Sequence, residues 1–182
     1  MDLDSLRIET ERLILRPTRA EDFVGWAAMM ADPDVMRFIG GVQPPHVAWR
    51  GFLSMAGAWA IQGFAMFSVI EKSSGAWLGR LGPWFPEGWP GSEIGWGLVR
   101  DAWGKGYATE GSAAAMDFVF DTLGWAEVIH PIDPDNDSSK RVASRLGSTL
   151  RGAGRLPVPL DKLPVEIWGQ TREQWRQRRR RA

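Results

Sequence analysis

The chain has 182 residues, 44% apolar and 24% charged, which predicts one folded domain with a sizeable core and excludes an intrinsically disordered chain. Its 22 basic and 22 acidic residues balance to a net charge of zero, and the absence of cysteine excludes disulfides and thiolate nucleophiles. No apolar run is long enough to cross a bilayer and the N-terminus lacks a signal-like segment, so we expect a cytoplasmic protein without a membrane partner.

The first third of the chain predicts one strand followed by helices. Residues 8–17 indicate an opening strand, and Thr18 and Glu21 have the spacing of a helix-capping box. Asp32, followed by a proline, predicts a second helix start. Residues 43–61 predict a longer helix, whose apolar face is expected to contain Trp49, Phe52, Leu53 and Ala56.

The middle of the chain predicts a sheet that continues around a helix. Residues 64–71 and 76–85 indicate two strands joined by a Ser-Ser-Gly turn, and residues 93–99 indicate a third. A helix is expected at 108–123 and another strand at 127–132. This order suits a mixed sheet covered by helices.

The end of the chain predicts a short helix, a loop, a strand and a basic tail. Residues 152–164 are rich in Gly and Pro and indicate a long loop, and residues 165–168 indicate a late strand. Five arginines lie in residues 176–182, so we expect a disordered, solvated tail after a single domain at 1–175. A salt-sensitive contact of this tail with RNA or an acidic surface is the alternative.

The Gly-rich segment 103–110 lies between a predicted strand and a predicted helix. A strand, a glycine turn and a helix start present several backbone N–H groups to one anion, and Lys105 adds a positive charge. A Walker A loop is excluded because Val99 stands where its first glycine is needed. A dinucleotide fingerprint fits poorly because its third small residue would be Thr109. An ordinary glycine turn before a helix remains the plain alternative.

A third pattern fits the segment better, and a second motif follows it. Trp103, Gly106 and Ala108 occupy the marked places of Gln/Arg-x-x-Gly-x-Gly/Ala, the acyl-CoA loop of the GNAT acetyltransferases, with Trp replacing Gln or Arg. Further on, Asn136, then Ser139, a short helix and Leu-Gly resemble the later segment of that family. The sequence of residues 103–110 closely resembles that of the branch that acetylates ribosomal-protein N-termini (RimJ/RimL type). The resemblance to the family extends over roughly residues 8–175.

The resemblance implies an α/β GNAT-like fold, a mixed and mostly antiparallel sheet that is splayed in the middle and flanked by helices. It implies an N-acetyltransferase that moves an acetyl group from acetyl-CoA to a primary amine by direct attack in a ternary complex, without a metal. The Val99 N–H would polarise the thioester carbonyl, and Asn136 would contact the pantetheine arm. The implied acetyl-CoA contacts are Leu98, Val99, Trp103, Gly104, Lys105, Gly106, Tyr107, Ala108, Thr109, Asn136 and Ser139.

Amide formation needs a base for the amine and a proton for the leaving sulfur. Glu93 opens a central strand and is the candidate base; its alternative is a surface strand end. Family members often place a Tyr where this chain has Ala143, so Ser139 is the candidate donor to the CoA sulfur, with helix capping as its rival role. Glu110 is expected to be structural, near the positive end of the helix dipole.

Several readings stay open at this point. The only histidines are His46, expected to face solvent, and His130, expected to be structural. The amine acceptor is open among an N-terminal peptide, a small amine, an antibiotic and a polyamine, and a homodimer is open too. A catalytically silent CoA-binding module and a nucleic-acid-associated protein that uses the Arg tail are the alternative functions, although nucleic acid is not the expected partner.

Overall fold

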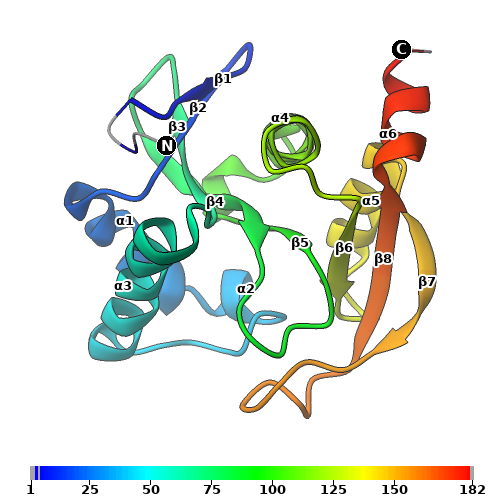
Figure 1. The fold of residues 1–182 in the computed structure, drawn as a ribbon. Helices are drawn as coiled ribbons and strands as arrows, with labels where there is room; N and C mark the ends of the chain where they lie inside the picture. Colours follow the sequence, from blue (N-terminus) through cyan, green and yellow to red (C-terminus); the bar gives the residue numbers. More distant parts are fainter. Residues whose placement is uncertain (1–2, 4, 181–182) are drawn as a thin grey trace.

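The computed structural model describes residue 3 and residues 5–180, and it contains one eight-stranded sheet in the order β1-β2-β3-β4-β5-β6-β8-β7 (Figure 1). The strands are β1 Ile8–Glu9, β2 Leu13–Arg16, β3 Phe67–Glu71, β4 Trp77–Trp84, β5 Glu93–Leu98, β6 Glu127–Ile132, β7 Thr149–Gly154 and β8 Val165–Thr171. The helices are α1 Phe23–Ala31, α2 Pro33–Met36, α3 Pro45–Gln62, α4 Tyr107–Asp121, α5 Asp137–Leu146 and α6 Arg172–Arg179, with 3₁₀ turns η1 Ala20–Asp22 and η2 Arg100–Ala102.

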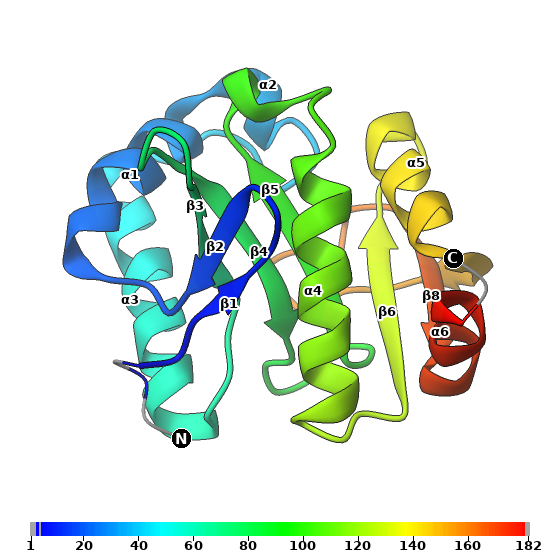
Figure 2. The same ribbon diagram turned by 90° about the horizontal axis from the view of Figure 1, so that it is seen from above.

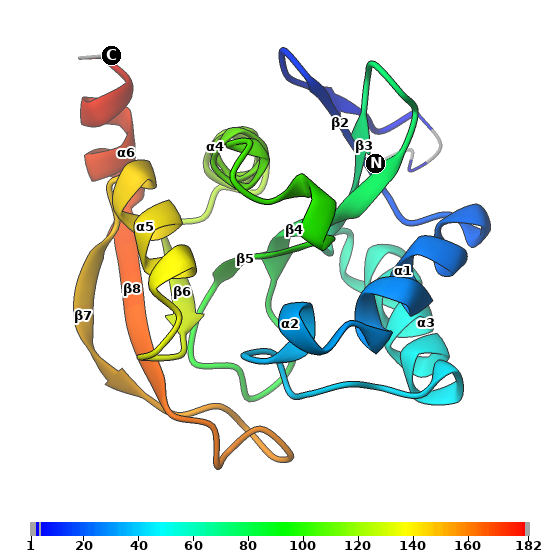
Figure 3. The same cartoon turned by 180° about the vertical axis from the view of Figure 1, so that it is seen from behind.

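The sheet is divided into two halves at β5 and β6. All other neighbouring strands pair antiparallel, whereas β5 and β6 run parallel and have one registered pair, Glu93 opposite Ile129. The two strands diverge beyond that pair, and α4 lies over the opening between the halves (Figures 2 and 3). The predicted mixed, mostly antiparallel, splayed sheet is therefore confirmed.

Helices cover both faces of the first half of the sheet. Figure 1 shows α4 on one face and α1, α2 and α3 on the other. The contact with α4 is close, because a Cβ added at Gly111 would lie 2.6 Å from the Leu81 side chain. Phe67 and Phe118 meet across the same interface with their ring centroids 5.4 Å apart. None of the helices within residues 3 and 5–180 is long and apolar enough to span a membrane.

The N-terminal elements differ from the prediction in two details. The expected strand at 8–17 is a hairpin of β1 and β2, because the Leu13 N–H bonds to the Thr10 hydroxyl (2.9 Å) and closes a turn. The expected capping box is also wrong: the Asp22 carboxylate, not Glu21, accepts the Arg19 N–H at 2.9 Å. Asp22 is the better partner because it is buried and is held by a 2.7 Å ion pair to Arg16.

The helix starts at Asp32 and in α3 were predicted correctly, but the buried face of α3 was not. Asp32 accepts the N–H of Asp34 at 2.9 Å, as an N-cap does before a proline. In α3 the expected face had Trp49 and Leu53, which are 43% and 48% exposed. The buried residues are Ala48, Phe52, Met55 and Trp59, so the apolar stripe follows a register that shares only Phe52 with the prediction.

The C-terminal end is more ordered than its composition indicates. The expected loop at 152–164 starts three residues late, because residues 152–154 belong to β7, which pairs with β8 up to Gly154. The tail expected to be disordered from residue 176 instead continues as α6 up to Arg179, anchored by the buried Trp175. Ion pairs from Arg176 to Asp121 (2.9 Å) and from Arg179 to the α4 surface fix the basic side chains. The last two residues of the expected tail lie outside the described residues.

Candidate active site

A cavity of about 1100 Å³ opens where the two halves of the sheet separate. Its walls come from β4, β5, the start of α4, α5, the helices α1–α3 and the loop between β7 and β8. Glu93 lines it, and of the expected acetyl-CoA contacts only Val99 and Lys105 lie outside its lining. The cavity thus brings together residues from both sequence motifs and from the first third of the chain.

The free edge of β5 faces this cavity. The Val99 N–H donates to the Leu78 carbonyl at 2.9 Å, so it points toward β4 and is not available to polarise a thioester. Because peptide groups alternate between the two edges of a strand, the N–H of Leu98 points the other way, toward β6. The carbonyl of Ile94, on that same edge, does contact β6 through His130 Nδ1 at 2.6 Å. The oxyanion role predicted for Val99 is therefore wrong, and Leu98 is the donor that faces the opening.

The segment before α4 has the geometry of an anion site. Gly104 and Gly106 have φ of +73° and +82°, which L-amino acids with side chains avoid. The first backbone bond of α4 runs from the Glu110 N–H to the Gly106 carbonyl at 3.0 Å. The N–H groups of residues 107–109 come before it and have no carbonyl within the helix to accept them. Several donors at the positive end of a helix thus face the cavity.

Arg12 supports this segment from outside the cavity. Its guanidinium pairs with Glu110 at 2.6 Å, donates to the Lys105 carbonyl at 2.9 Å and lies 4.5 Å from the centre of the Tyr107 ring. Glu110 is therefore engaged in contacts, as expected for a structural residue. Burial raises its pKa, but the hydrogen bonds from Thr10 and Arg12 together hold that pKa below the usual value. Tyr107, the only tyrosine, bonds to Glu71 and is not directed at a reacting group.

Ser139 is held at the opening by an indole from the opposite strand. The Trp96 Nε1–H donates to the Ser139 Oγ at 3.2 Å, which leaves the hydroxyl proton of Ser139 free for another acceptor. Helix capping, the other role considered for Ser139, is performed by Asn136. Its Oδ1 accepts the Ser139 N–H at 3.0 Å and caps α5. Ala143, at the position where family members often have a Tyr, is fully buried and offers no phenol to the reaction.

Glu93 has the environment of a proton acceptor. Its carboxylate accepts the Trp89 Nε1–H at 2.6 Å and lies over Gly95, where an added Cβ would be 2.3 Å from the Glu93 Oε1. Removal from water raises the pKa of Glu93 to about 7, while the Trp89 hydrogen bond and the nearby Arg80 charge lower it by less. A carboxyl with this pKa exchanges protons readily near neutral pH.

His130 has a structural arrangement and His46 an exposed one. His130 is 2% exposed, its Nδ1–H bonds to Ile94 and its Nε2 accepts the Ser148 hydroxyl at 2.9 Å. Burial lowers its pKa to about 4, so the ring stays neutral and ties β6 to β5.

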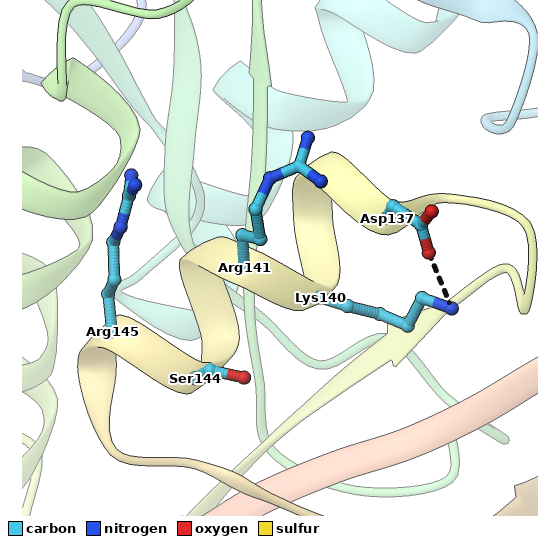
Figure 4. Close-up of a pocket in the computed structure, with 5 residues that line it drawn as sticks. All are labelled: Asp137, Lys140, Arg141, Ser144 and Arg145. Atoms are coloured by element: carbon cyan, nitrogen blue, oxygen red, sulfur yellow. Dashed lines mark ion pairs between the residues drawn. The ribbon is translucent and has the colours of Figure 1, made fainter.

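A shallow depression lies along α5. Arg141 and Arg145 line it on one side of the helix, and Lys140, paired with Asp137, lines it on the other (Figure 4).

The sequence matches a family model over most of its length. The model described as Acetyltransferase (GNAT) domain matches residues 12–149, which include both motifs and the cavity walls from β4 to α5. The chain belongs to the GNAT acetyltransferase family. This membership establishes an acyl-CoA-dependent acetyltransferase fold and implies acetyl-CoA as co-substrate.

Relatives of this GNAT protein support the same assignment. It is 29% identical over 146 residues to the protein named "Uncharacterized N-acetyltransferase p20" of Bacillus licheniformis, across 79% of this chain and 82% of that one. The solved acetyltransferase of Agrobacterium tumefaciens str. C58 matches with a TM-score of 0.82 and 28% identity over 92% of this chain and 95% of that one. A putative ribosomal-protein-serine acetyltransferase of Vibrio cholerae matches with a TM-score of 0.77 and 18% identity over 92% and 98%, which shows a shared fold alone.

The GNAT cavity also contains residues that sequence reasoning missed. Trp89, Trp96 and Arg80 contact or neighbour the expected catalytic groups, yet nothing in their local spacing indicates this. Among residues 3 and 5–180, no cluster of three or more His, Asp or Glu side chains is arranged to hold a metal.

Proposed function

We propose that the protein acetylates a primary amine by direct transfer from acetyl-CoA in a ternary complex. The observation that carries this proposal is one cavity that joins an N–H-lined helix start to a carboxyl with a pKa of about 7. The two ends are what amide formation needs, an anion site for the donor and a base for the amine. The alternative of a silent CoA-binding module does not account for Glu93.

The donor would be held by backbone groups more than by side chains. The N–H groups from Gly104 to Thr109 would bind the pyrophosphate, and the edge of β5 at Leu98 would pair with the pantetheine arm. The fit is supported by the open space at Gly104, where an added Cβ would meet nothing within 4 Å. Asn136 lines the same opening and would contact the arm. When bound, acetyl-CoA supplies the thioester that the amine attacks.

The chain's own groups would carry the proton transfers. Glu93 would take the proton of the incoming ammonium, directly or through water, because a carboxyl with a pKa of about 7 exchanges protons readily near neutral pH. The Leu98 N–H would stabilise the charge that develops on the thioester oxygen. Ser139, with its Oγ held by Trp96, would give its proton toward the leaving sulfur.

Acetyl-CoA binding tests the donor site of this proposal. Gly106→Leu forces a side chain onto a cavity-lining residue with φ +82°, where the added Cβ would lie 3.4 Å from the Arg12 guanidinium. This should displace the backbone N–H groups of the segment, so we expect acetyl-CoA affinity, measured by calorimetry, to fall about tenfold or more. Gly124→Leu is the matched control, since Gly124 has φ +72°, nothing within 4 Å of an added Cβ and no place in the cavity. Each variant should lose about 1–2 kcal/mol of stability from backbone strain. Equal affinity in both variants would refute the anion site.

A further inference from the structure

Arg80 is a cation without a counter-ion on the acceptor side of the cavity. It lies on β4, and its guanidinium carbon is 5.3 Å from the centre of the Trp26 ring. Among residues 3 and 5–180, the buried Nε atom has no hydrogen-bond partner, and the Nη1 atom donates to the thioether sulfur of Met66 at 2.6 Å. Both Trp26 and Met66 line the cavity, so the guanidinium borders the space that an acceptor would fill.

The surroundings do not neutralise this charge. Glu93 is close enough to act on Arg80 electrostatically, but its carboxylate bonds to Trp89, and the two charged groups form no ion pair in the described part of the chain. A thioether is a weak acceptor, and burying an unpaired charge costs several kcal/mol. Packing alone would be served better by an apolar residue. The arrangement therefore points to a ligand that brings the missing acceptor atoms.

The space next to Arg80 is shaped for a small molecule with an apolar body. Gly97 leaves the face of β5 without a side chain directly opposite Arg80 in the sheet register, and an added Cβ there would come no closer than 3.8 Å to any neighbour. Facing this bare surface are the apolar cavity residues Trp26, Met30, Met36, Met55, Trp84 and Leu160. Methionine and tryptophan walls accept varied apolar groups, because methionine is flexible and indole faces are broad.

We propose that the acceptor is a free amino carboxylic acid with an apolar side chain, whose carboxylate binds Arg80 while its amine faces Glu93. This inference rests on the proposed function, because it uses the same cavity and the same base. The planar guanidinium matches a carboxylate through two parallel hydrogen bonds. One partly buried guanidinium suits one negative charge, because Arg37, the other cation in this half of the cavity lining, is exposed and lies over the Phe38 ring.

The same charge disfavours other amines. A polyamine would place a second cation beside Arg80, which is repulsive in a site with little water. The N-terminus of a peptide carries an amide where the free acid carries its carboxylate, so it would leave Arg80 unpaired. Arg80 would thus select the acceptor, while Glu93 would serve the reaction itself.

Binding without turnover tests the Arg80 site on its own. With CoA present, 3-phenylpropionate and its amide should be titrated into the full chain and followed by tryptophan fluorescence. We expect the acid to bind at least tenfold more tightly than the amide, Arg80→Met to abolish this preference and Arg80→Lys to keep part of it. Arg80→Met should also unfold at the same or a higher temperature, because it removes a buried unpaired charge. Equal binding of acid and amide, or a preference that survives in Arg80→Met, would overturn the proposal.

Turnover with a matched pair of acceptors is a second test of whether Arg80 selects a carboxylate. Phenylalanine should exceed phenylalanine amide in kcat/KM by at least tenfold, and Arg80→Met should bring that ratio close to one while amide turnover persists. If the wild type favours the amide, Arg80 does not select a carboxylate. If no amine is acetylated, the proposed function fails, and the phenylpropionate titration still decides whether Arg80 binds carboxylates. Should Arg80→Met fail to fold, a preference reduced in Arg80→Lys supports the proposal and an unchanged one contradicts it.

Discussion

In the proposed reaction, Glu93 is the residue whose protonation state sets the rate. We expect kcat/KM to rise with pH through about 7, because the carboxylate form is the base and burial raises the pKa of Glu93 to that value. Glu93→Gln keeps an acceptor for the Trp89 Nε1–H, yet it should lose about 100-fold or more in kcat/KM, the usual contribution of a general base. A pH series of both proteins is the measurement. The variant should retain only the titration of the amine, and a rise through 7 in both would assign that pKa to another group.

The same residue links stability to pH. Because its folded pKa is raised from 4.5 to about 7, Glu93 favours the folded state below pH 4.5, and that contribution is lost as the pH rises through 7. The carboxylate form is thus an unfavourable buried charge at pH 8. In the denaturant series of the two proteins we expect Glu93→Gln to be the more stable at pH 8, by about 1–3 kcal/mol, and no more stable at pH 4.

Ser139 should affect the turnover step and leave donor binding intact. Its hydroxyl is aligned by Trp96 and faces the opening where the sulfur would leave, so Ser139→Ala removes a proton donor without removing a backbone contact. We expect kcat at saturating acetyl-CoA to fall about 10- to 100-fold, with acetyl-CoA affinity changed little. Ser144→Ala, on the exposed side of α5 in Figure 4, is the control. Unchanged turnover in Ser139→Ala would remove Ser139 from the mechanism.

At the scale of elements, α6 shows how a strongly basic segment becomes ordered. Trp175 is 4% exposed and its Nε1–H bonds to Asp117 of α4 at 2.8 Å, so one aromatic side chain attaches the helix to the domain. We expect Trp175→Ala to cost about 3–5 kcal/mol in urea unfolding, as buried tryptophans do. Arg179→Ala removes a surface ion pair to Asp117 and the contact of Arg179 with the Trp175 ring, and should cost about 1 kcal/mol. Equal small losses in both variants would mean that α6 is not part of the folded unit.

The elements also show which sequence signals predict structure. Asp32 before a proline, and glycines such as Gly104 and Gly106, predict local geometry because they act through neighbouring backbone atoms alone. The buried face of α3 was misjudged because Trp49 is as apolar as the residues that pack, and the packing partners lie elsewhere in the chain. The order of α6 was missed for the same reason, since its anchor Asp117 is 58 residues before Trp175.

At the scale of the molecule, the splayed sheet converts two motifs into one site. The single registered pair at Glu93 holds β5 and β6 together, and beyond it the strands separate and expose donors on β5 to the cavity. The GNAT resemblance was sufficient to predict this fold, whereas the anion site and Glu93 as the base stay predictions. It did not indicate which N–H faces the opening, because that depends on strand register, and Leu98 replaces Val99 for this reason.

The acceptor side of the cavity was beyond prediction from sequence. Arg80 lies on β4 and Trp26 on α1, and only the folded chain brings Arg80 near Glu93 and Trp26 against Arg80. The acceptor class, the ribosomal-protein branch, the cytoplasmic location and a homodimer therefore stay predictions. For the acceptor class the structure offers a direct argument, which is the unpaired charge of Arg80.

Acetyl transfer by the full chain is the measurement that tests the central claim most directly. The protein should be mixed with acetyl-CoA and a panel of primary amines that includes apolar amino acids, peptides and polyamines, and CoA thiol release should be followed together with the mass of the amine. We expect one acetylated amine per thiol released, with a rate about 100-fold lower in Glu93→Gln. Tight acetyl-CoA binding without acetylation of any amine, or transfer that is unaffected in Glu93→Gln, would contradict it.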